Sequence, residues 1–381
     1  MNGMGGSKMR VINISSVHRS IPWARQFPDN TFEWDGWRFI INAENEDYDY
    51  LVVCHDLHAP IKPNCAPEKI ILAGSEPPAV WKYQPNFLKQ FAWVITQDTR
   101  LKHPARILYQ PGIPWYIGWR PDSTNLCDTL NYRELETLFN ETKTKLISVI
   151  ASDKKVTPIH IKRLEFAHKL KAHYGKRMDF YGRSFKRMGF YGRGFTPMDD
   201  KLDALKEYRF SVVLENSNIN HYFTEKFTDC VIAGTYPIYF GCPNLEQYFP
   251  QNSFVRININ RFASSVKIID NAIEEEFDKK YRQPLQMARD LAMRKHNLFP
   301  MLIDIIKDIE AGKYGKANLP RTFGGEMLPF GHQKFRAMFG PKYIHPFRKF
   351  LRQLANNYAF FNFLRAIYRK LKLKSSKGFI R

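Results

Sequence analysis

A polar cluster between residues 215 and 226 combines side chains that recognise a charged ligand. It comprises Glu215, Asn216, Tyr222, Thr224, Glu225 and Lys226. The cluster follows an apolar run at 210–214 that has the length of a buried strand. Ligands of open α/β sheets bind where such strands end, so the sequence indicates a ligand site here.

Lys226 indicates the charge of that ligand. It falls in the first turn of a helix that Thr224 can cap, where a cation loses roughly 0.3 to 1 kcal/mol against the helix dipole. An anion bound at the helix N-terminus would offset this cost, and a nucleotide phosphate is the usual anion. A surface lysine that tolerates the penalty is the alternative for Lys226 taken alone.

The elements that position the cluster form a strand, a loop, a helix and a second strand. The helix runs from Thr224 to Ala233, Gly234 ends it, and 236–240 predicts the next strand. A strand at 146–151 and an amphipathic helix at 159–173, opened by Thr157-Pro158, precede the unit. Helices broken at Pro284 and Pro300 are expected within 270–309. Residues 9–110 predict a first Rossmann-like unit, with strands at 11–14, 38–41, 50–54, 69–73, 92–96 and 107–110.

The stretch from 214 to 254 resembles the donor-site signature of the α-1,3/4-fucosyltransferases. It carries, in that family's order, Leu-Glu-Asn-Ser at 214–217, Tyr-Phe-Thr-Glu-Lys at 222–226, Ala-Gly-Thr-Tyr-Pro at 233–237, Phe-Gly at 240–241 and Pro-Gln-Asn-Ser-Phe at 250–254. A match of this length is more specific than any short motif. The resemblance implies a bacterial-type member of glycosyltransferase family 10. It also implies an α/β fold of the GT-B type, with two Rossmann-like domains facing across a cleft.

The resemblance assigns roles to individual side chains. Glu76 follows a predicted buried strand in the segment Ile-Leu-Ala-Gly-Ser-Glu-Pro-Pro at 71–78. The family has a Glu-Pro element at the corresponding place, and its carboxylate acts as general base. Arg163, with Phe166 and Leu170 at the family's spacing, would contact the donor diphosphate. Glu76 is therefore the expected catalytic residue, and the expected donor-binding residues are Arg163, Glu215, Asn216, Tyr222, Thr224, Glu225 and Lys226. Without the resemblance, a solvated Glu76 and a solvent-facing Arg163 are the simpler interpretations.

The implied reaction is inverting transfer of L-fucose from GDP-fucose to a hydroxyl of a cell-surface or lipopolysaccharide glycan, with the 3-position of GlcNAc favoured. The expected contacts are the diphosphate for Arg163 and Lys226, the ribose hydroxyls for Glu225, the nucleotide for Tyr222, and the sugar for Asn216 with Glu215. No cofactor is expected beyond GDP-fucose as donor substrate, and stimulation by a divalent metal is left open. No metal site is expected, because His55 and His58 follow a strand and precede a proline.

Positive charge is concentrated near the carboxyl terminus. Residues 334–381 contain thirteen Lys and Arg and no Asp or Glu, so they hold +13 of the net charge of +21. Aromatic and aliphatic residues recur there at helical spacing, which is typical of a basic amphipathic helix on an anionic membrane surface. Packing against the catalytic domains and contact with nucleic acid are the alternatives, and no nucleic-acid partner is expected.

The expected organisation is an acceptor-side domain at 9–143, a GDP-sugar donor domain at 144–325 and the basic tail at 334–381. Residues 1–8 are polar and no window holds the ~18 to 20 apolar residues that span a bilayer. We therefore expect a cytoplasmic protein that associates peripherally with the inner face of the cytoplasmic membrane. The five cysteines show neither zinc spacing nor a disulfide framework, which fits a reducing compartment.

A ten-residue duplication interrupts the second predicted unit. KRMDFYGRSF at 176–185 recurs as KRMGFYGRGF at 186–195, and we interpret the pair as one strand with a duplicated loop. The pattern does not identify which copy is the strand.

Two other functions fit the same residues. A transferase of the same fold that uses another nucleotide sugar would share the phosphate and ribose contacts. A non-catalytic basic adaptor of membranes or nucleic acid would depend on 334–381 and not on Glu76 or Lys226. The motifs do not identify the acceptor glycan or the linkage position.

Overall fold

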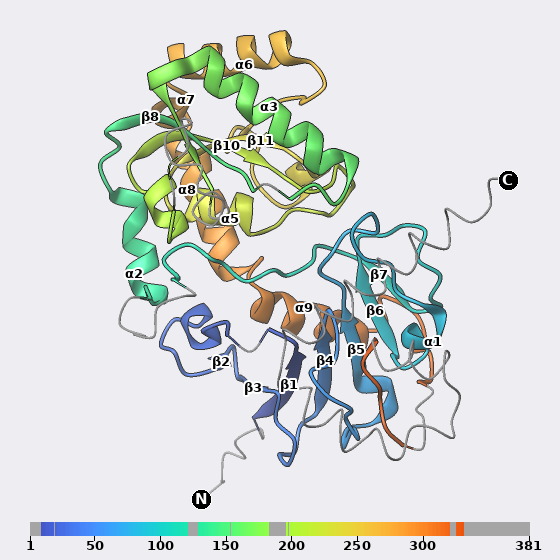
Figure 1. The fold of residues 1–381 in the computed structure, drawn as a ribbon. Helices are drawn as coiled ribbons and strands as arrows, with labels where there is room; N and C mark the ends of the chain where they lie inside the picture. Colours follow the sequence, from blue (N-terminus) through green and yellow to red (C-terminus); the bar gives the residue numbers. More distant parts are fainter. Residues whose placement is uncertain are drawn as a thin grey trace, which may run out of the picture.

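Two sheets organise the chain, one in each of two α/β units (Figure 1). The computed structural model describes residues 9–18, 20–120, 129–152, 154–182, 196, 198–320 and 325–330. The predicted basic tail at 334–381, the second copy of the duplication at 186–195 and Cys127 lie outside these residues. The first copy contains strand β9 (Met178–Tyr181).

The sheet of the first unit has the order β2-β3-β1-β4-β5-β6-β7. Its strands are β1 (Arg10–Ser16), β2 (Glu33–Trp34), β3 (Trp37–Ile41), β4 (Tyr50–Cys54), β5 (Ile70–Ala73), β6 (Trp93–Thr96) and β7 (Arg106–Leu108). Every neighbouring pair is parallel except β2 and β3. All six predicted strands of this unit are confirmed. The central strands β4, β5 and β6 are apolar runs that the sheet buries on both faces.

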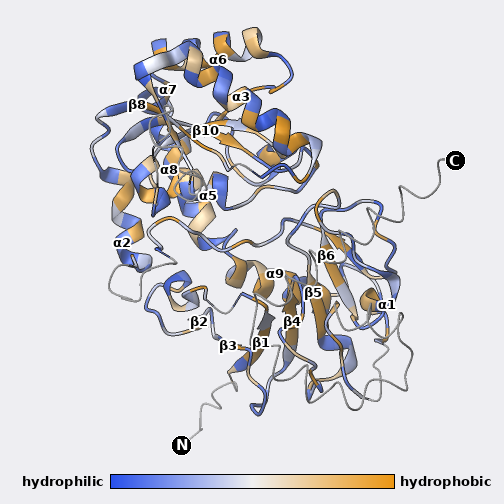
Figure 2. Ribbon diagram, viewed as in Figure 1, coloured by the Kyte–Doolittle hydropathy of each residue, from blue (hydrophilic) through white to orange (hydrophobic). Residues whose placement is uncertain are grey.

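Each face of the first sheet packs against a segment from a different part of the chain. Ile12, Ile14 and Val52 pack in one cluster with helix α9 (Leu298–Glu310). Leu51 and Val53 point to the other face, where the core includes the short helix α1 (Pro85–Leu88), Met327 and Phe330. Figure 2 shows the hydrophobic colouring of these strands and of α9. The α9 segment falls in the predicted donor range 144–325, yet it packs in the core of the first unit.

The sheet of the second unit has the order β12-β11-β10-β8-β9, with every neighbouring pair parallel. Its other strands are β8 (Lys145–Ile150), β10 (Tyr208–Leu214), β11 (Tyr236–Phe240) and β12 (Val255–Arg256). Its helices are α2 (Tyr132–Thr137), α3 (Pro158–Tyr174), α5 (Glu225–Ile232), α6 (Phe262–Glu274), α7 (Phe277–Lys280) and α8 (Arg282–Arg294). Helix α2 falls in the predicted range 9–143, yet its Tyr132 and Leu135 are buried in the core of this second unit.

The prolines that we expected to break the helices lie inside helix starts. Pro284 is the third residue of α8 and Pro300 is the third residue of α9. A proline is tolerated in the first turn because the backbone N–H it lacks has no partner within the helix. The non-helical residues that separate α7 from α8 and α8 from α9 therefore lie just before these prolines. The predicted interruptions at Pro284 and Pro300 were wrong by a few residues.

Within residues 9–330, the described chain passes between the units twice. The first passage includes Trp115, Gly118 and Leu130, and both units bind it. Arg25 of the first unit donates to the carbonyls of Trp115 (3.3 Å) and Leu130 (2.8 Å). Asp200 of the second unit accepts from the N–H of Gly118 (2.9 Å). The second passage joins α8 to α9, where the Gln110 amide donates to the His296 carbonyl at 3.2 Å. Figure 1 shows both passages between the two units.

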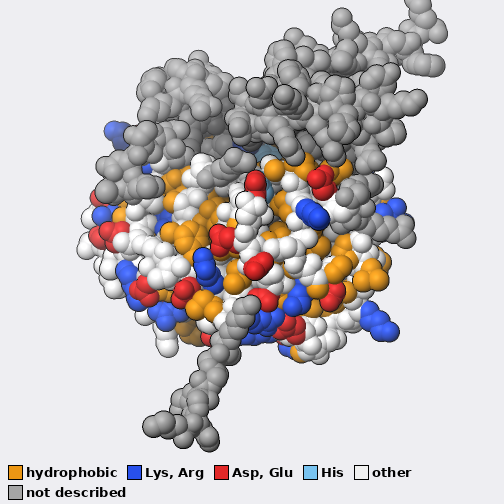
Figure 3. Space-filling model, turned by 90° about the horizontal axis from the view of Figure 1, so that it is seen from below, with side chains coloured by type: hydrophobic (Ala, Val, Ile, Leu, Met, Phe, Trp, Pro, Cys, Tyr) orange, Lys and Arg blue, Asp and Glu red, His pale blue; other side chains and the backbone are white. Residues whose placement is uncertain are grey.

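Surface charge on the described residues is mixed. Residues 1–333 carry +8, because +13 of the total +21 falls at 334–381. On the face seen in Figure 3, the described residues present Lys and Arg beside Asp and Glu, among hydrophobic side chains. Within the described ranges, no helix has both the length and the apolar content needed to cross a membrane.

Candidate functional site

Arg163 lies where the strand order of the second sheet reverses. Its guanidinium donates to the carbonyl of Leu214 at the end of β10 (3.2 Å) and to Ser152 Oγ just after β8 (3.1 Å). Because β8 and β10 are adjacent and their connections leave in opposite directions, their carboxyl ends form the switch point at which open α/β sheets usually bind ligands. Arg163 is 3% exposed, burial lowers its pKa, and its Nε has no hydrogen-bond partner among the described residues.

Glu215 is fully buried directly after β10. One carboxylate oxygen accepts from the backbone N–H of Thr224 at 2.8 Å, and the Thr224 hydroxyl donates to both oxygens at 3.0 and 2.8 Å. Thr224 also caps α5, as predicted, by accepting from the N–H of Lys226. Burial raises the pKa of Glu215, and Lys226 opposes that shift. The two predicted donor-binding residues Glu215 and Thr224 thus face each other inside the protein.

Gly241 makes room for this arrangement. A Cβ at this position would lie 2.5 Å from Glu215 Cγ and would also collide with the Tyr239 hydroxyl. That hydroxyl accepts from the backbone N–H of Cys242 at 2.8 Å. Glycine is therefore required here because the backbone after β11 passes directly against Glu215.

Lys226 has carboxylate neighbours in the structure. Its Nζ donates to Thr224 Oγ1 at 2.9 Å and lies 3.4 Å from Glu215 and 3.5 Å from Glu225. These carboxylates supply a second explanation for a lysine in the first turn of a helix, besides the anion that the sequence suggested. The Lys226 side chain is still 23% exposed, so part of it remains accessible to a ligand.

Glu225 is held by a lysine that we did not predict. Lys201 Nζ lies 3.2 Å from Glu225 Oε1 and 2.7 Å from Asp229 Oδ2. Burial alone would raise the pKa of Glu225, but Lys201 and Lys226 outweigh it and lower that pKa to about 2. Glu225 is therefore ionised at neutral pH although it is only 12% exposed.

Glu76 faces this group from the first unit. It follows β5, and Lys226, Glu225, Lys154 and Glu215 of the second unit all act electrostatically on it. Burial raises the pKa of Glu76, and Lys226 lowers it in part. The buried Oε2 has no hydrogen-bond partner among the described residues. A partly buried carboxylate with a raised pKa is suited to proton transfer.

Tyr222 and Asn216 complete the predicted set. Tyr222 is 1% exposed, and burial raises its pKa, with Glu215, Glu76 and Glu225 adding to the shift. Asn216 Oδ1 is buried without a partner in the described part of the chain. The structure thus brings the eight predicted residues together around the facing edges of the two sheets, while their individual roles stay predictions.

Four side chains beside this group were missed by the sequence analysis: Lys154, His160, Lys201 and Asp229. His160 bonds Thr157 Oγ1 through Nδ1 at 2.7 Å, and burial with the nearby Arg163 lowers its pKa to about 4. A signal for Lys201 was present, since Glu225 and Asp229 stand four residues apart on one helix. Two like charges at that spacing destabilise a helix and call for a cation between them. The sequence does not say which cation fills that place.

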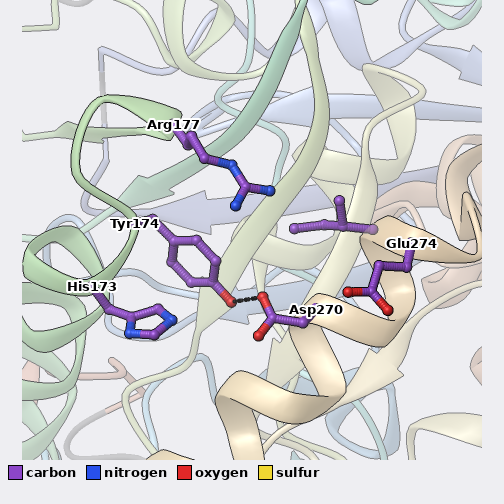
Figure 4. A pocket seen from close by; sticks show the side chains of 6 residues that line it. His173, Tyr174, Arg177, Asp270 and Glu274 are labelled. Atoms are coloured by element: carbon purple, nitrogen blue, oxygen red, sulfur yellow. Dashed lines mark hydrogen bonds between the residues drawn. The ribbon is translucent and has the colours of Figure 1, made fainter.

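A separate cavity lies at the opposite end of α3. It has a volume of about 260 Å³ and is lined by His173, Tyr174, Arg177, Asp270, Ile273 and Glu274 (Figure 4). The Tyr174 hydroxyl donates to Asp270 at 2.9 Å. The helix separates this cavity from Arg163 by three turns, so it is not part of the candidate site. In the described ranges, no cluster of three His, Cys, Asp or Glu side chains could hold a metal ion.

Two α/β units whose largely parallel sheets face each other at their strand ends have the GT-B type of fold that the sequence predicted. Residues 140–297 match the model described as "Glycosyltransferase family 10 (fucosyltransferase) C-term". This stretch of the chain is therefore similar to the carboxyl-terminal domain of that family. This similarity agrees with the signature read from residues 214–254.

Curated relatives match over shorter stretches. The chain is 29% identical over 115 residues to "Alpha-(1,3)-fucosyltransferase FucT" of Helicobacter pylori, covering 29% of this chain and 24% of that protein. It is 34% identical over 104 residues to "Alpha-(1,3)-fucosyltransferase B" of Drosophila melanogaster, covering 26% and 23%. It is 46% identical over 59 residues to a "Putative fucosyltransferase-like protein" of Arabidopsis thaliana, covering 15% and 12%. The matches therefore span less than a quarter of the length of each relative.

The chain is also similar to a solved structure. Superposition on a crystal structure of an α1,3-fucosyltransferase gives a TM-score of 0.47 at 16% identity, covering 85% of this chain and 96% of the other. The fold assignment here rests on the sheet order of this chain.

Proposed function

We propose that the protein is an inverting fucosyltransferase that moves L-fucose from GDP-fucose to a hydroxyl of a glycan. One observation carries the proposal. Three buried polar atoms without hydrogen-bond partners among the described residues, Glu76 Oε2, Arg163 Nε and Asn216 Oδ1, belong to residues of the fucosyltransferase signature and its predicted base. Buried polar groups are costly unless a ligand or water satisfies them. A nucleotide sugar between the units would supply such partners.

In the proposed reaction, Glu76 takes the proton of the acceptor hydroxyl. The acceptor oxygen forms a bond to the anomeric carbon of fucose as the bond from that carbon to the diphosphate breaks, and GDP leaves with the electron pair. Arg163 and Lys226 would stabilise the charge that develops on the leaving diphosphate. Glu225 would accept from the ribose hydroxyls. Attack from the face opposite the leaving group inverts the anomeric centre.

Because Glu215 and Thr224 bind each other inside the second unit, we assign them a structural role and not a direct contact with the donor. Their polar atoms bind each other and the Lys226 ammonium group, so they hold Lys226 in place. Asn216, which follows Glu215, would then be the direct contact of the sugar. Tyr222 would line the nucleotide pocket.

The acceptor is proposed as a cell-surface or lipopolysaccharide glycan, at the 3-position of GlcNAc. Support for this linkage comes from the names of the Helicobacter pylori and Drosophila melanogaster relatives, both α-(1,3)-fucosyltransferases. Other relatives are named for protein O-fucosylation, including "GDP-fucose protein O-fucosyltransferase 3" of Danio rerio, which is 33% identical over 89 residues. A peptide hydroxyl therefore belongs in the acceptor panel.

The test is transfer by the purified protein, followed by mass spectrometry. Donors are GDP-fucose, GDP-mannose and UDP-glucose, and acceptors are galactosyl-N-acetylglucosamine, its 3-deoxy and 4-deoxy forms and a Ser/Thr peptide. We expect one added deoxyhexose from GDP-fucose, with loss of transfer on the 3-deoxy acceptor. Transfer from a UDP-sugar alone would overturn the donor assignment, and transfer to the peptide alone would overturn the glycan acceptor.

We also propose that residues 334–381 bind the inner, anionic face of the cytoplasmic membrane. The +13 charge and the aromatic residues at helical spacing support this location. The full chain should sediment with phosphatidylglycerol vesicles and not with phosphatidylcholine vesicles, while a chain ending at residue 333 should bind neither. Equal binding of both chains to anionic vesicles would contradict the proposal.

A further inference from the structure

Lys201 lies outside the fucosyltransferase signature, yet its ammonium group is closer than that of Lys226 to the carboxylate proposed to bind the ribose. Its Nζ is 3.2 Å from Glu225 Oε1, whereas Lys226 Nζ is 3.5 Å from the same oxygen. Lys201 is 12% exposed. Lys226 divides its contacts among Glu215, Thr224 and Glu225. Lys201 thus pairs with Glu225 on the side that faces Asp229.

Lys201 separates two acidic side chains on one helix. Glu225 and Asp229 stand four residues apart on α5, and the Asp229 side chain is fully buried. Two carboxylates at this spacing repel each other, and burial strengthens the repulsion. Lys201 Nζ contacts both. Without this cation, either Glu225 turns away from Asp229 or one of the two carboxylates takes up a proton.

The position of Lys201 is itself fixed. Asp229 uses one oxygen for Lys201, at 2.7 Å, and the other for the backbone N–H of Tyr116, at 3.0 Å. Asp200, the residue before Lys201, accepts from the N–H of Gly118 at 2.9 Å and from the N–H of Leu202 at 2.9 Å. The lysine is therefore held between α5 and the first passage between the units. A side chain fixed in this way orients its partner without a reorganisation cost when a ligand arrives.

We propose that Lys201 is a positioning residue for donor recognition, which fixes the Glu225 carboxylate in the orientation that accepts from the ribose hydroxyls. The inference rests on the proposed function, because it assigns Glu225 to the ribose of a guanosine nucleotide. Lys201 does not touch the donor. Its effect is confined to the ribose contact, whereas the diphosphate contacts of Arg163 and Lys226 do not depend on it.

The experiment compares the affinities of GDP and of 2′,3′-dideoxy-GDP by titration calorimetry on the full chain. A charged hydrogen bond to the ribose should make wild type bind GDP about tenfold or more tightly than the dideoxy form. Lys201→Met should bring this ratio close to one while changing the affinity for dideoxy-GDP little. Lys201→Arg, which keeps the charge, should retain most of the ratio.

Two further variants complete the design. Lys206→Met is the matched control, because Lys206 is 43% exposed, pairs with Glu141 at 3.7 Å and should leave the ratio unchanged. Glu225→Gln should lower the ratio as Lys201→Met does, and the double variant should lower it no further, since the two residues act as one unit. If Lys201→Met does not fold, Lys201→Gln takes its place, since it removes the charge while keeping a hydrogen-bond donor.

The possible outcomes are separable. An unchanged ratio in the folded Lys201→Met or Lys201→Gln protein overturns the inference alone. An equal loss of affinity for both nucleotides also overturns it, because that result is the signature of a structural role. If wild type binds neither nucleotide, the proposed function is overturned and the inference falls with it. If wild type binds both equally, the ribose role of Glu225 and the inference are overturned while the donor assignment stands.

Discussion

Glu215 and Glu225 share the lysine Lys226, yet their pKa values shift in opposite directions. Burial dominates at Glu215 and raises its pKa, whereas Lys201 together with Lys226 overcomes burial at Glu225 and lowers its pKa to about 2. Lys201 Nζ lies 3.2 Å from Glu225 Oε1, and this contact adds to the effect of Lys226 on the Glu225 carboxyl. Glu225, with its pKa lowered to about 2, is therefore ionised at neutral pH.

Glu76→Gln should lower the rate of transfer strongly while leaving nucleotide binding intact. Loss of a general base costs about 10²- to 10⁴-fold in kcat, and the amide keeps the shape of the side chain. Titration calorimetry with GDP should give the wild-type affinity. The matched control is Glu68→Gln, an exposed carboxylate of the same unit, which should transfer at the wild-type rate. A Glu76→Gln enzyme with normal kcat would contradict the role of Glu76.

The pH dependence of wild-type transfer follows from the same carboxylate. A base acts only when unprotonated, and burial raises the pKa of Glu76 above its ordinary 4.5. We therefore expect kcat to fall on acidification with an apparent pKa above 4.5, and the fall should be absent from the remaining activity of Glu76→Gln. Parallel kcat profiles in the two proteins would assign the acidic limb to another group.

At the scale of elements, the turn between β10 and α5 depends on one hydroxyl. Thr224 caps α5 and satisfies Glu215 at the same time. Thr224→Val keeps the shape but removes both functions, which should cost about 1 to 3 kcal/mol of unfolding free energy. Thr224→Ser should retain most of the stability. Urea denaturation checks this, and equal stability of the valine and serine variants would contradict the assigned contacts.

Gly241→Ala tests the support of Glu215 from β11. The added Cβ would meet Glu215 Cγ at 2.5 Å, and such overpacking costs about 1 to 3 kcal/mol. Displacing Glu215 also displaces Thr224 and Lys226, so the affinity for GDP should fall. Gly312→Ala is the control, because Gly312 has a φ of +73° and open space around it. It should lose stability through backbone strain and keep its affinity for GDP.

Sequence patterns predicted the elements of the site well and their partners poorly. The strand 236–240 and the helix that Thr224 opens were predicted correctly, because alternation of apolar runs, caps and glycines is local information. Lys201 could not be predicted, since 24 residues separate it from Glu225 and its place depends on the packing of two elements. Which copy of the duplication forms β9 was equally undetermined, because the two copies are almost identical.

At the scale of the whole molecule, the sequence could predict two units but not how the chain is divided between them. The run Leu298–Glu310 is apolar enough to be buried in either unit, and nothing local says that it packs on β1 and β4. Helix α2 is a second example: it packs in the core of the second unit although it lies before β8, the first strand of that unit. Such choices depend on contacts between distant parts of the chain and so have no periodic signal.

His296, at the second passage between the units, should make stability depend on pH. Its Nε2 donates to the carbonyl of Tyr248 at 2.9 Å, and burial lowers its pKa to about 4. Between 6.5, its ordinary value, and about 4, the unfolded chain binds a proton that the folded protein does not. Stability is therefore fully present above pH 6.5 and is lost progressively as the pH falls towards 4.

The measurement is the unfolding free energy in urea at neutral and acidic pH. His296→Gln keeps a donor for Tyr248 and cannot be protonated, so its stability should fall less on acidification than that of wild type. The exposed His173 provides the control, because His173→Gln should fall as wild type does. Identical pH slopes for wild type and His296→Gln would contradict the prediction.

Helix α9 completes the core of the amino-terminal sheet. We therefore expect the folding of that sheet to be delayed during synthesis on the ribosome. Strands β1 to β7 emerge first, but the apolar face of β1 and β4 has no cover until residues 298–310 leave the exit tunnel. The second unit is complete by then, so we expect it to fold first, in the reverse of the usual order for chains with two domains. The nascent amino-terminal half is consequently the part of the molecule that most needs a chaperone.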